Sequence, residues 1–278
     1  MDYKIVVDSC CELPPEYLND GRFERVPLGL EVGEYHIWDD ENFNQAEFLE
    51  KVAACPKCPK SSCPSPERFM EAYHTDAEVV FAVTLSSKLS GSYNSAMVGK
   101  QLYEETYGAK KIQVVDSESA SCGETQIALK LMELCEAGLS FEEVVEQITA
   151  FRDNMNTYFI LDNLETLRKN GRLSKVKAFV ASTLNIKPVM GADKGEILQR
   201  SQGIGMKKAM AKMAELIVAE LKDSHLKKIV ITHCNAMERA EKMKKLLAEK
   251  LAGIEIMILD TAGISSMYAN DGGIIVAV

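Results

Sequence analysis

The sequence predicts an α/β fold of two domains, and two observations predict it. The first half repeats one order of elements: a short apolar run, a hydroxyl-rich turn and an amphipathic helix. This alternation is typical of a parallel sheet flanked by helices. The pattern changes near residue 155, and 278 residues suffice for two modest domains. We therefore expect an N-terminal α/β domain over residues 1–155 and a second, mixed α/β domain over residues 156–278.

Three repeats make up the predicted parallel sheet. Residues 4–7 form its first strand, and residues 13–17 start a helix with proline in the first turn. Residues 79–85 run into five serines within ten residues and then into a helix over 93–107. Residues 112–115 run into a second serine cluster. Ligands of open α/β sheets bind at the carboxyl ends of the strands, so we expect the hydroxyl clusters to converge at that edge.

The second half combines a hairpin with alternating helices and strands. Gly191–Gly195 separates two extended runs and predicts the hairpin turn. Asn170-Gly171 is a good C-cap for a short helix. The predicted strands cover residues 157–161, 184–190, 196–200, 228–232, 254–259 and 272–278, and the predicted helices cover residues 163–169, 207–222 and 238–251.

Composition and charge exclude several classes of partner. The chain is 46% hydrophobic and 26% charged, as is usual for globular proteins, and its net charge is -9. Lysine and arginine form no basic block, so nucleic acid and anionic membrane surfaces are not expected as partners. The sequence has neither a signal-peptide pattern nor an apolar run near the ~20 residues that span a bilayer. We expect a cytoplasmic protein without an integral membrane segment.

Three cysteines raise the alternative of a zinc site. Cys55 and Cys58 form a CxxC pair, and Cys63 follows five residues later. A structural zinc site needs four ligands, and His74 is the nearby candidate for the fourth. Because a second CxxC pair is missing, we favour a surface loop with free thiols and predict no metal.

A serine or cysteine hydrolase is the second alternative. The sequence contains no G-x-S-x-G, the pattern of a nucleophile elbow. His233 follows a predicted strand and is the candidate base, but the sequence pairs it with no nucleophile.

An anion pocket fits the serine cluster better. Ser90, Gly91 and Ser92 come directly before the helix predicted over 93–107. Hydroxyls and free N–H groups at the start of a helix bind carboxylate or phosphate oxygens, and glycine lets the backbone approach a ligand. A single serine in this position is more often just a helix cap.

Six motifs, in order along nearly the whole chain, resemble those of the DegV family. They are Val7-Asp8-Ser9 with Glu12-Leu13-Pro14, Lys60-Ser-Ser-Cys-Pro-Ser65, Leu89-Ser-Gly-Ser-Tyr-Asn-Ser-Ala96, Val115-Asp-Ser117 with Ser121 and Gly123, Leu164-Glu-Thr-Leu-Arg-Lys-Asn-Gly-Arg172, and Ile186-Lys-Pro188.

The resemblance implies a two-domain protein that binds one long-chain fatty acid, such as palmitate, between and within its domains. Members of the FakB type present the acyl carboxylate to a separate fatty acid kinase, which makes acyl phosphate. The resemblance therefore implies a lipid-binding protein that is not an enzyme. A fatty acid is its ligand, no other cofactor is expected, and a fatty acid kinase is its expected partner.

Motif matching assigns the head-group residues. The carboxylate-binding threonine of the family falls on Ser61, its serine on Ser90, and its glycine-rich arginine motif on Arg172. The predicted fatty-acid-binding set has no catalytic residue and no metal ligand, and it consists of Ser61, Ser62, Ser90, Gly91, Ser92, Asn94, Arg172 and Tyr268.

Two departures from the family pattern remove positive charge near the expected carboxylate. Tyr268 stands where the family has a histidine, and Ile204 stands where it often has an arginine. Asp271, which follows Asn270 in the altered motif, adds a negative charge if it faces the pocket. Two other functions stay open: a hydrolase that uses Ser90 or a cysteine with His233, and a member with altered head-group specificity that no longer serves the kinase.

Overall fold

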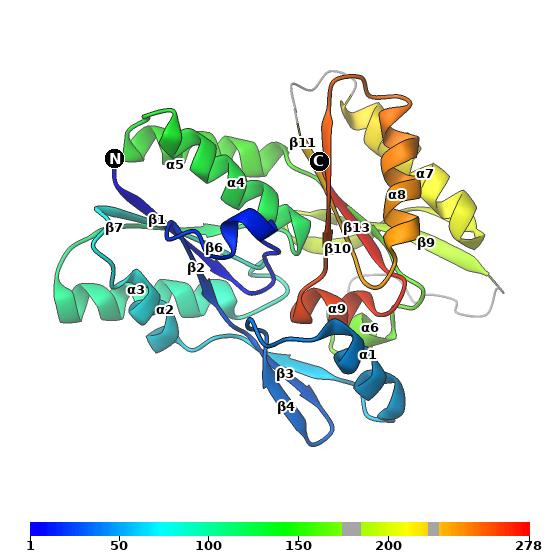
Figure 1. Ribbon diagram of the computed structural model, residues 1–278, viewed down its shortest axis with the longest axis horizontal. Helices are drawn as coiled ribbons and strands as arrows, with labels where there is room; N and C mark the ends of the chain where they lie inside the picture. Colours follow the sequence, from blue (N-terminus) through cyan, green and yellow to red (C-terminus); the bar gives the residue numbers. More distant parts are fainter. Residues whose placement is uncertain (174–184, 222–227) are drawn as a thin grey trace.

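A computed structural model describes residues 1–173, 185–221 and 228–278 (Figure 1). These residues form a four-stranded sheet, a six-stranded sheet and a small three-stranded sheet, with helices packed around them. None of the described helices combines the length and the apolar character that a bilayer crossing needs.

The four-stranded sheet is parallel, as the sequence predicts. Its order is β2–β1–β6–β7, and every neighbouring pair runs parallel. The strands are β1 (Tyr3–Asp8), β2 (Phe23–Val26), β6 (Val79–Thr84) and β7 (Lys111–Asp116).

Helices cover both faces of this sheet (Figure 1). Alternate residues of a strand point to opposite faces. Ile5 and Val7 therefore pack with one pair of helices, whereas Val6 packs with the other pair. The first pair is α4 (Cys122–Glu136) and α5 (Phe141–Asn154), and the second pair is α2 (Pro66–Tyr73) and α3 (Ser92–Tyr107).

The six-stranded sheet is mixed and lies within residues 157–277. Its order is β10–β9–β8–β13–β11–β12, in which only the β11–β12 pair is parallel. Its strands are β8 (Thr157–Ile160), β9 (Ile186–Asp193), β10 (Glu196–Ile204), β11 (Lys228–His233), β12 (Glu255–Asp260) and β13 (Ile274–Ala277). The helices that follow its strands are α6 (Glu165–Lys169), α7 (Gly205–Leu221) and α8 (Met237–Ala248). The expected domain boundary at residue 155 falls between α5 and β8 and stays a prediction.

A small antiparallel sheet, which the sequence analysis missed, lies beneath these two layers (Figure 1). Its order is β4–β3–β5, and its strands are β3 (Gly29–Val32), β4 (Tyr35–Trp38) and β5 (Lys60–Ser62). Short helices α1 (Gln45–Ala54) and α9 (Gly263–Ala269) pack beside it. In this cluster Ile264 and Met267 of α9 meet Leu28 and Phe48 of the first half. The small sheet therefore joins the two halves of the chain.

Several predicted elements differ from the observed ones. The helix expected over 13–17 is a single 3₁₀ turn, Pro15–Tyr17, because the chain returns at once to pair β2 with β1. Helices α1, α2, α5 and α9 were not predicted. The expected strand over 184–190 starts at Ile186, and residues 184 and 222 of the predicted elements lie outside the described residues.

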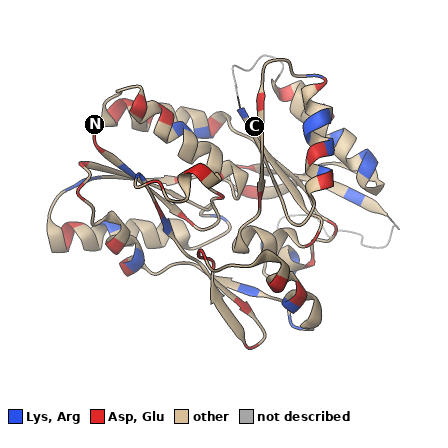
Figure 2. Ribbon diagram, viewed as in Figure 1, with Lys and Arg blue, Asp and Glu red and all other residues tan. Residues whose placement is uncertain are grey.

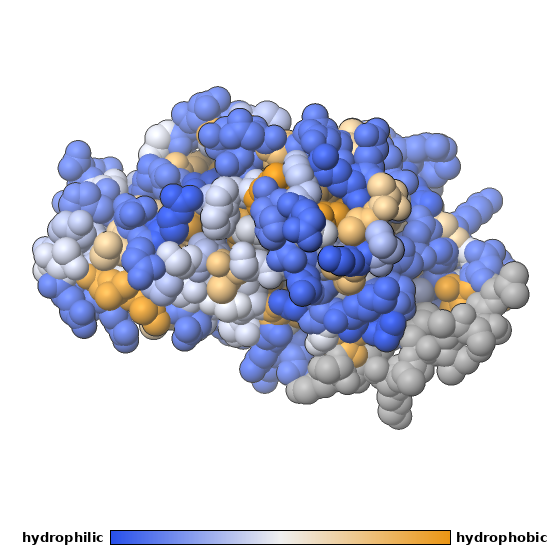
Figure 3. Space-filling model, turned by 90° about the horizontal axis from the view of Figure 1, so that it is seen from below, coloured by the Kyte–Doolittle hydropathy of each residue, from blue (hydrophilic) through white to orange (hydrophobic). Residues whose placement is uncertain are grey.

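Charged residues of both signs are interspersed on the surface. Figure 2 shows acidic and basic residues alternating along the ribbon of the outer helices, and Lys242 and Glu238 of α8 form an ion pair. The face in Figure 3 is mainly hydrophilic, with apolar side chains in small separate groups.

The close approach of α2 and α3 depends on Gly99. A Cβ added to this residue would lie 2.6 Å from the carbonyl oxygen of Pro66 and 2.8 Å from the Cβ of Phe69. We predict that Gly99→Ala lowers the free energy of unfolding by about 1–3 kcal/mol, because the helices must move apart. Gly21→Ala is the control, since no atom lies within 4 Å of its added Cβ. Urea denaturation measures both, and equal stability of the two variants would contradict the prediction.

Candidate functional site

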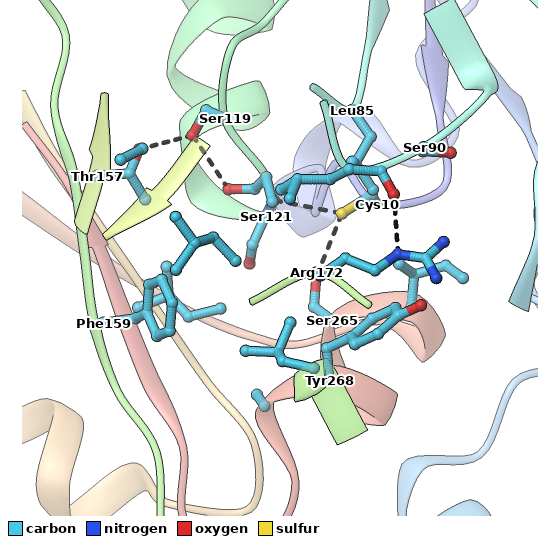
Figure 4. Close-up of a pocket in the computed structure, with 18 of the residues that line it drawn as sticks. Cys10, Leu85, Ser90, Ser119, Ser121, Thr157, Phe159, Arg172, Ser265 and Tyr268 are labelled. Carbon is cyan, nitrogen blue, oxygen red and sulfur yellow. Dashed lines mark hydrogen bonds between the residues drawn. The ribbon is translucent and has the colours of Figure 1, made fainter. Parts of the chain in front are cut away.

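A pocket lies between the parallel sheet and the mixed sheet (Figure 4). It contains about 860 Å³ of space not filled by protein, counting the part open to solvent. Both halves of the chain line the pocket, so its shape depends on how they pack.

Most of the pocket wall is apolar. The loop after β6 contributes Leu85 and Leu89, and strand β8 contributes Phe159. The other large apolar residues are Leu28, Leu161, Leu167, Ile197, Ile264 and Ile275. An elongated apolar group bound here would be removed from water along much of its length.

One end of the pocket carries a set of polar side chains. The hydroxyls of Ser61 and Tyr268 lie 3.1 Å apart and share a hydrogen bond. The guanidinium carbon of Arg172 lies 5.8 Å from the centre of the Tyr268 ring, and its Nε donates to the carbonyl of Leu89 at 3.0 Å. We call Ser61, Ser90, Arg172 and Tyr268 the head-group end. It offers hydroxyl donors and one fixed positive charge to a ligand.

Different elements deliver the side chains of the head-group end. Ser61 is the central residue of β5 and pairs with Leu30 of β3. Tyr268 lies in the last turn of α9, and Arg172 follows the end of α6. Burial raises the pKa of Tyr268. Its hydroxyl therefore stays protonated near neutral pH and is available as a donor.

The serines of the cluster after β6 have two different positions: some line the pocket, and others bond to buried groups of the protein. Ser90 lines the pocket, and its Oγ accepts the N–H of Ser92 at 3.2 Å. Ser92 is fully buried, and its hydroxyl donates to Asp8 at 2.6 Å. Gly91 and Asn94 are exposed at the start of α3 and do not line the pocket. Their binding roles, and that of Ser92, stay predictions.

Ser62 also lies outside the pocket. It is exposed on β5, and its hydroxyl faces Gly29 of β3, where it lines a separate groove with Trp38. The structure thus brings four of the eight predicted residues to one end of the pocket: Ser61, Ser90, Arg172 and Tyr268.

Asp8 ties together the loops that follow the strands of the parallel sheet. Its carboxylate accepts the N–H groups of Cys10 at 3.0 Å and Leu85 at 2.8 Å, besides the Ser92 hydroxyl. The loop after β7 joins them, because Ser86 donates its N–H to the carbonyl of Ser119. The hydroxyl clusters therefore converge at the carboxyl edge, as predicted, but several of their hydroxyls serve the scaffold.

Two more buried carboxylates of the first half hold the start of α9. Asp39 accepts the N–H of Gly263 at 2.7 Å and that of Ile264 at 2.9 Å. Glu12 accepts the N–H of Ala262 at 3.1 Å and the hydroxyl of Ser121 at 2.8 Å. Burial raises the pKa of Glu12 to about 7 and that of Asp39 to about 6, although these hydrogen bonds favour the charged forms.

A second set of hydroxyls lines the pocket on the side opposite Arg172 (Figure 4). Ser119 and Thr157 share a hydrogen bond of 2.6 Å that joins the two halves of the chain. Ser265 of α9 lies beside Tyr268 in Figure 4, with its hydroxyl 3.7 Å from the sulfur of Cys10. Among the residues that line the pocket, Arg172 is basic and Glu118, next to Ser119 in the sequence, is acidic, so the head-group end is the basic end of the pocket.

The hydrolase alternative gains no support from the position of His233. This residue does not line the pocket. Its Nδ1 accepts the N–H of Ala236, and its Nε2, which lies 3.5 Å from Asp260, makes no hydrogen bond to the described side chains. Burial lowers its pKa. The pair of nucleophile and base that a hydrolase needs is therefore not formed at His233 in this structure.

The zinc alternative gains no support either. Within residues 1–173, 185–221 and 228–278, no group of three or more His, Cys, Asp or Glu residues is placed to hold a metal ion. Cys58 accepts a hydrogen bond from Asn170, and Cys63 lies 3.8 Å from the hydroxyl of Ser95. The thiols thus have separate neighbours.

Two residues expected to alter the head-group charge lie outside the pocket. Ile204, at the end of β10, is 65% exposed. Asp271 is exposed and accepts a hydrogen bond from Asn235 at 2.8 Å. Of the altered motif, only Tyr268 reaches the head-group end, because Asn270 has a positive φ and turns the chain away.

Comparison with known proteins identifies the family. The model of the DegV family, described as an uncharacterised protein family, matches residues 2–278. The chain belongs to the DegV family. A DegV domain-containing protein of Streptococcus pneumoniae is 36% identical over 282 residues, which cover 99% of this chain and 98% of the relative.

Solved structures of DegV proteins share the fold and contain fatty acids. A DegV family protein of Ruminococcus gnavus, refined with vaccenic acid, has 52% identity and a TM-score of 0.96 over 99% of both chains. The Fatty Acid Kinase (Fak) B3 protein of Streptococcus pneumoniae, loaded with linoleic acid, has 33% identity and a TM-score of 0.88. That match covers 100% of this chain and 99% of the other.

Sequence reasoning missed the acidic residues that shape this DegV site. Glu12 enters the sequence pattern only as one position of the Val7–Pro14 motif, and Asp39 follows a strand that the sequence did not predict. An isolated acidic residue is usually a surface residue, so neither gave a signal on its own. The opening Asp-Ser motif was a usable signal, because an aspartate directly after a buried strand lies at the ligand edge.

The pKa of Glu12 predicts a pH dependence of stability. This carboxyl binds its proton more tightly in the folded chain than at its ordinary value of 4.5. Its contribution to the free energy of unfolding is therefore full below pH 4.5 and lost as the pH rises through about 7. The loss amounts to at most about 3 kcal/mol.

Chemical denaturation between pH 4.5 and 8 measures this contribution. We predict that the unfolding free energy of the native protein, relative to that of Glu12→Gln, falls as the pH rises from 4.5 to 8. The exposed Glu50→Gln is the control for removing one acid from the surface. Parallel pH curves for the native protein and Glu12→Gln would contradict the prediction.

Proposed function

We propose that this protein binds one long-chain fatty acid in the pocket between its two large sheets and presents the carboxylate to a fatty acid kinase. One observation carries the proposal: an apolar pocket whose one end gathers Ser61, Tyr268 and Arg172. An amphiphile with a single anionic head group matches this distribution. Related structures with 52% and 33% identity hold vaccenic and linoleic acid, which supports the assignment.

The head-group end suits a carboxylate. Ser61 and Tyr268 have two hydroxyl protons between them, and their mutual hydrogen bond uses one. A carboxylate oxygen placed between them accepts both protons, in charge-assisted bonds worth about 1.5–3 kcal/mol each. Arg172 adds a positive charge beside them, so the binding does not depend on the hydroxyls alone.

The acyl tail supplies most of the affinity in this proposal. Each methylene moved from water into the apolar part of the pocket contributes ~0.8 kcal/mol. The tail lies along the wall that Leu85, Phe159 and Ile197 form. The wall is built from both halves of the chain, which agrees with the fatty acid lying between and within the domains.

Two observations support a role in presentation rather than catalysis. Ser61, Ser90 and Arg172 are only half-buried, so the carboxylate end of a bound lipid lies near solvent, where a second protein can reach it. His233 forms no pair with a serine or cysteine of the pocket. The neighbour named for fatty acid kinase supports a kinase as the partner.

A second function is favoured by Tyr268. This residue replaces the histidine of the family pattern, and its raised pKa keeps it neutral. The head-group end therefore has one cationic side chain fewer than a site that can protonate a histidine. The second candidate function is therefore lipid binding without service to the kinase.

Co-purification tests the lipid-binding function directly. The protein is expressed in bacteria, purified without detergent, denatured and extracted, and the extract is analysed by mass spectrometry. We predict one long-chain fatty acid in near-stoichiometric amount, because the buried tail slows its release. A substitution that fills the pocket, Ala192→Trp, is the control and should carry none. Recovery of lipid-free native protein that also fails to take up added fatty acid would contradict the proposal.

A separate assay tests the kinase role. A bacterial fatty acid kinase is supplied with ATP and the lipid-loaded protein, and acyl phosphate formation is measured. Product formation supports presentation to the kinase. If the protein binds the lipid tightly but no acyl phosphate forms, the result supports the second function, that of a member with an altered head-group end.

Ser61→Ala tests the head-group assignment. We predict that it lowers the affinity for hexadecanoic acid by about tenfold, because one charge-assisted hydrogen bond is lost. Ser87→Ala is the matched control, since Ser87 is exposed in the loop that also carries Ser90. Titration calorimetry measures both variants. If the two variants bind the acid with equal affinity, Ser61 does not bind the carboxylate, and the head group must lie in another part of the pocket.

A further inference from the structure

Helix α9 is held at both of its ends by the first half of the chain. At its start, Asp39 accepts the N–H groups of Gly263 and Ile264 at 2.7 and 2.9 Å. Near its end, the hydroxyl of Tyr268 bonds that of Ser61 at 3.1 Å. The first four N–H groups of a helix have no partner within it. A carboxylate from a distant part of the chain therefore replaces the usual local cap.

Both anchors belong to the same small sheet. Asp39 directly follows β4, and Ser61 is the centre of β5. Strand β3 pairs with both strands and places Leu30 opposite Ile37 and Ser61. The three strands thus fix the distance between the carboxylate of Asp39 and the hydroxyl of Ser61. Helix α9 spans that distance, from Gly263 to Tyr268.

The contact between Asp39 and α9 leaves no spare room. A Cβ on Gly263 would lie 2.7 Å from Oδ1 of Asp39 and 2.5 Å from a methyl of Leu30. Asp39 is completely buried, and its own N–H donates to the carbonyl of Leu28. Its carboxylate therefore has a fixed position, and α9 takes its position from it.

Gln45 of α1 strengthens the same anchor. Its side-chain amide donates to the carbonyl and the hydroxyl of Thr261 at 2.9 and 3.0 Å and to the hydroxyl of Ser266 at 3.2 Å. Its Oε1 accepts the N–H of Asn235 at 3.1 Å. One half-buried side chain of the first half thus bonds the segment before α9, α9 itself and the loop after β11.

We propose that Asp39, aided by Gln45, is a positioning residue for the head-group end of the pocket. It holds α9 on the small sheet so that Tyr268 and Ser61 face one carboxylate together. Asp39 itself does not line the pocket. The inference rests on the proposed function, because it assigns the residue that sets recognition of the head group and leaves tail binding unaffected.

The chemistry of an amide explains what Asp39→Asn should change. Asparagine has one acceptor oxygen, and its NH₂ group cannot accept the second N–H of α9. The start of α9 then loses one buried bond and moves, so Tyr268 leaves its position opposite Ser61. Of the large apolar residues of the pocket wall, only Ile264 lies on α9, whereas those of β8 and of the loop after β6 do not depend on this bond.

The test compares hexadecanoic acid with hexadecanol, which share a tail and differ in the head group. We predict that Asp39→Asn lowers the affinity for the acid by about tenfold and that for the alcohol by less than about threefold, because only the acid makes charge-assisted bonds. Glu143→Gln is the matched control. Glu143 accepts backbone N–H at the start of α5, outside the pocket, and its change leaves both affinities unaltered.

Combination with Tyr268→Phe separates positioning from general damage to the fold. If Asp39 acts through Tyr268, Tyr268→Phe lowers the affinity for the acid by a similar factor. The double variant Asp39→Asn/Tyr268→Phe is then no weaker than either single variant, since the same bond is lost in each. The proposal would be overturned if the double variant lost acid affinity by the product of the two single losses. It would also be overturned if Asp39→Asn lowered the affinities for the acid and the alcohol equally.

Gln45→Ala provides a second variant if Asp39→Asn does not fold. We predict a loss of about two- to threefold for the acid and none for the alcohol, because uncharged hydrogen bonds contribute less. An unchanged preference for the acid in Gln45→Ala would overturn the proposal. A native protein that binds neither compound would instead contradict the proposed function itself.

Discussion

The pocket depends on buried carboxylates that bind backbone N–H groups where the two large sheets meet. Asp8 joins the loops after β1 and β6, and Glu12 and Asp39 hold the start of α9. Such groups are costly to bury, and hydrogen bonds offset the cost only if the geometry is kept. The raised pKa values of Glu12 and Asp39 reflect that cost. The loops that form the pocket wall are therefore fixed before any ligand binds.

A rigid wall made from both halves of the chain explains how one site can hold two unlike parts of a ligand. The sheets and their loops supply an apolar channel, whereas the small sheet, α6 and α9 bring hydroxyls and a guanidinium to one end. Donors that are already held in place lose little conformational entropy when a ligand binds. Their hydrogen bonds therefore add to the preference for a ligand with the matching head group. In the proposed function the tail provides affinity, and Ser61, Tyr268 and Arg172 select the head group.

The sequence was sufficient for the parallel sheet and for most strands of the mixed sheet, because these depend on local patterns. The matched motifs also led to four residues that line one pocket, whose binding role stays a prediction. Regular apolar runs identified β1, β6 and β7, and the motifs identified Ser61 and Arg172. The small sheet was missed, since its strands of three or four residues carry no apolar run. Asp39 was missed for the same reason. Its function arises from contact with residues more than 220 positions away, which no local pattern encodes.

A crystal structure of the protein with hexadecanoic acid tests the central claim most directly. We predict that one carboxylate oxygen lies about 3 Å from the hydroxyl oxygens of both Ser61 and Tyr268, at normal hydrogen-bond distance. The tail then runs past Leu85 toward Phe159, and Asp39 keeps both bonds to α9. A carboxylate bound instead at Ser119 and Thr157, or a fatty acid bound outside this pocket, would contradict the account.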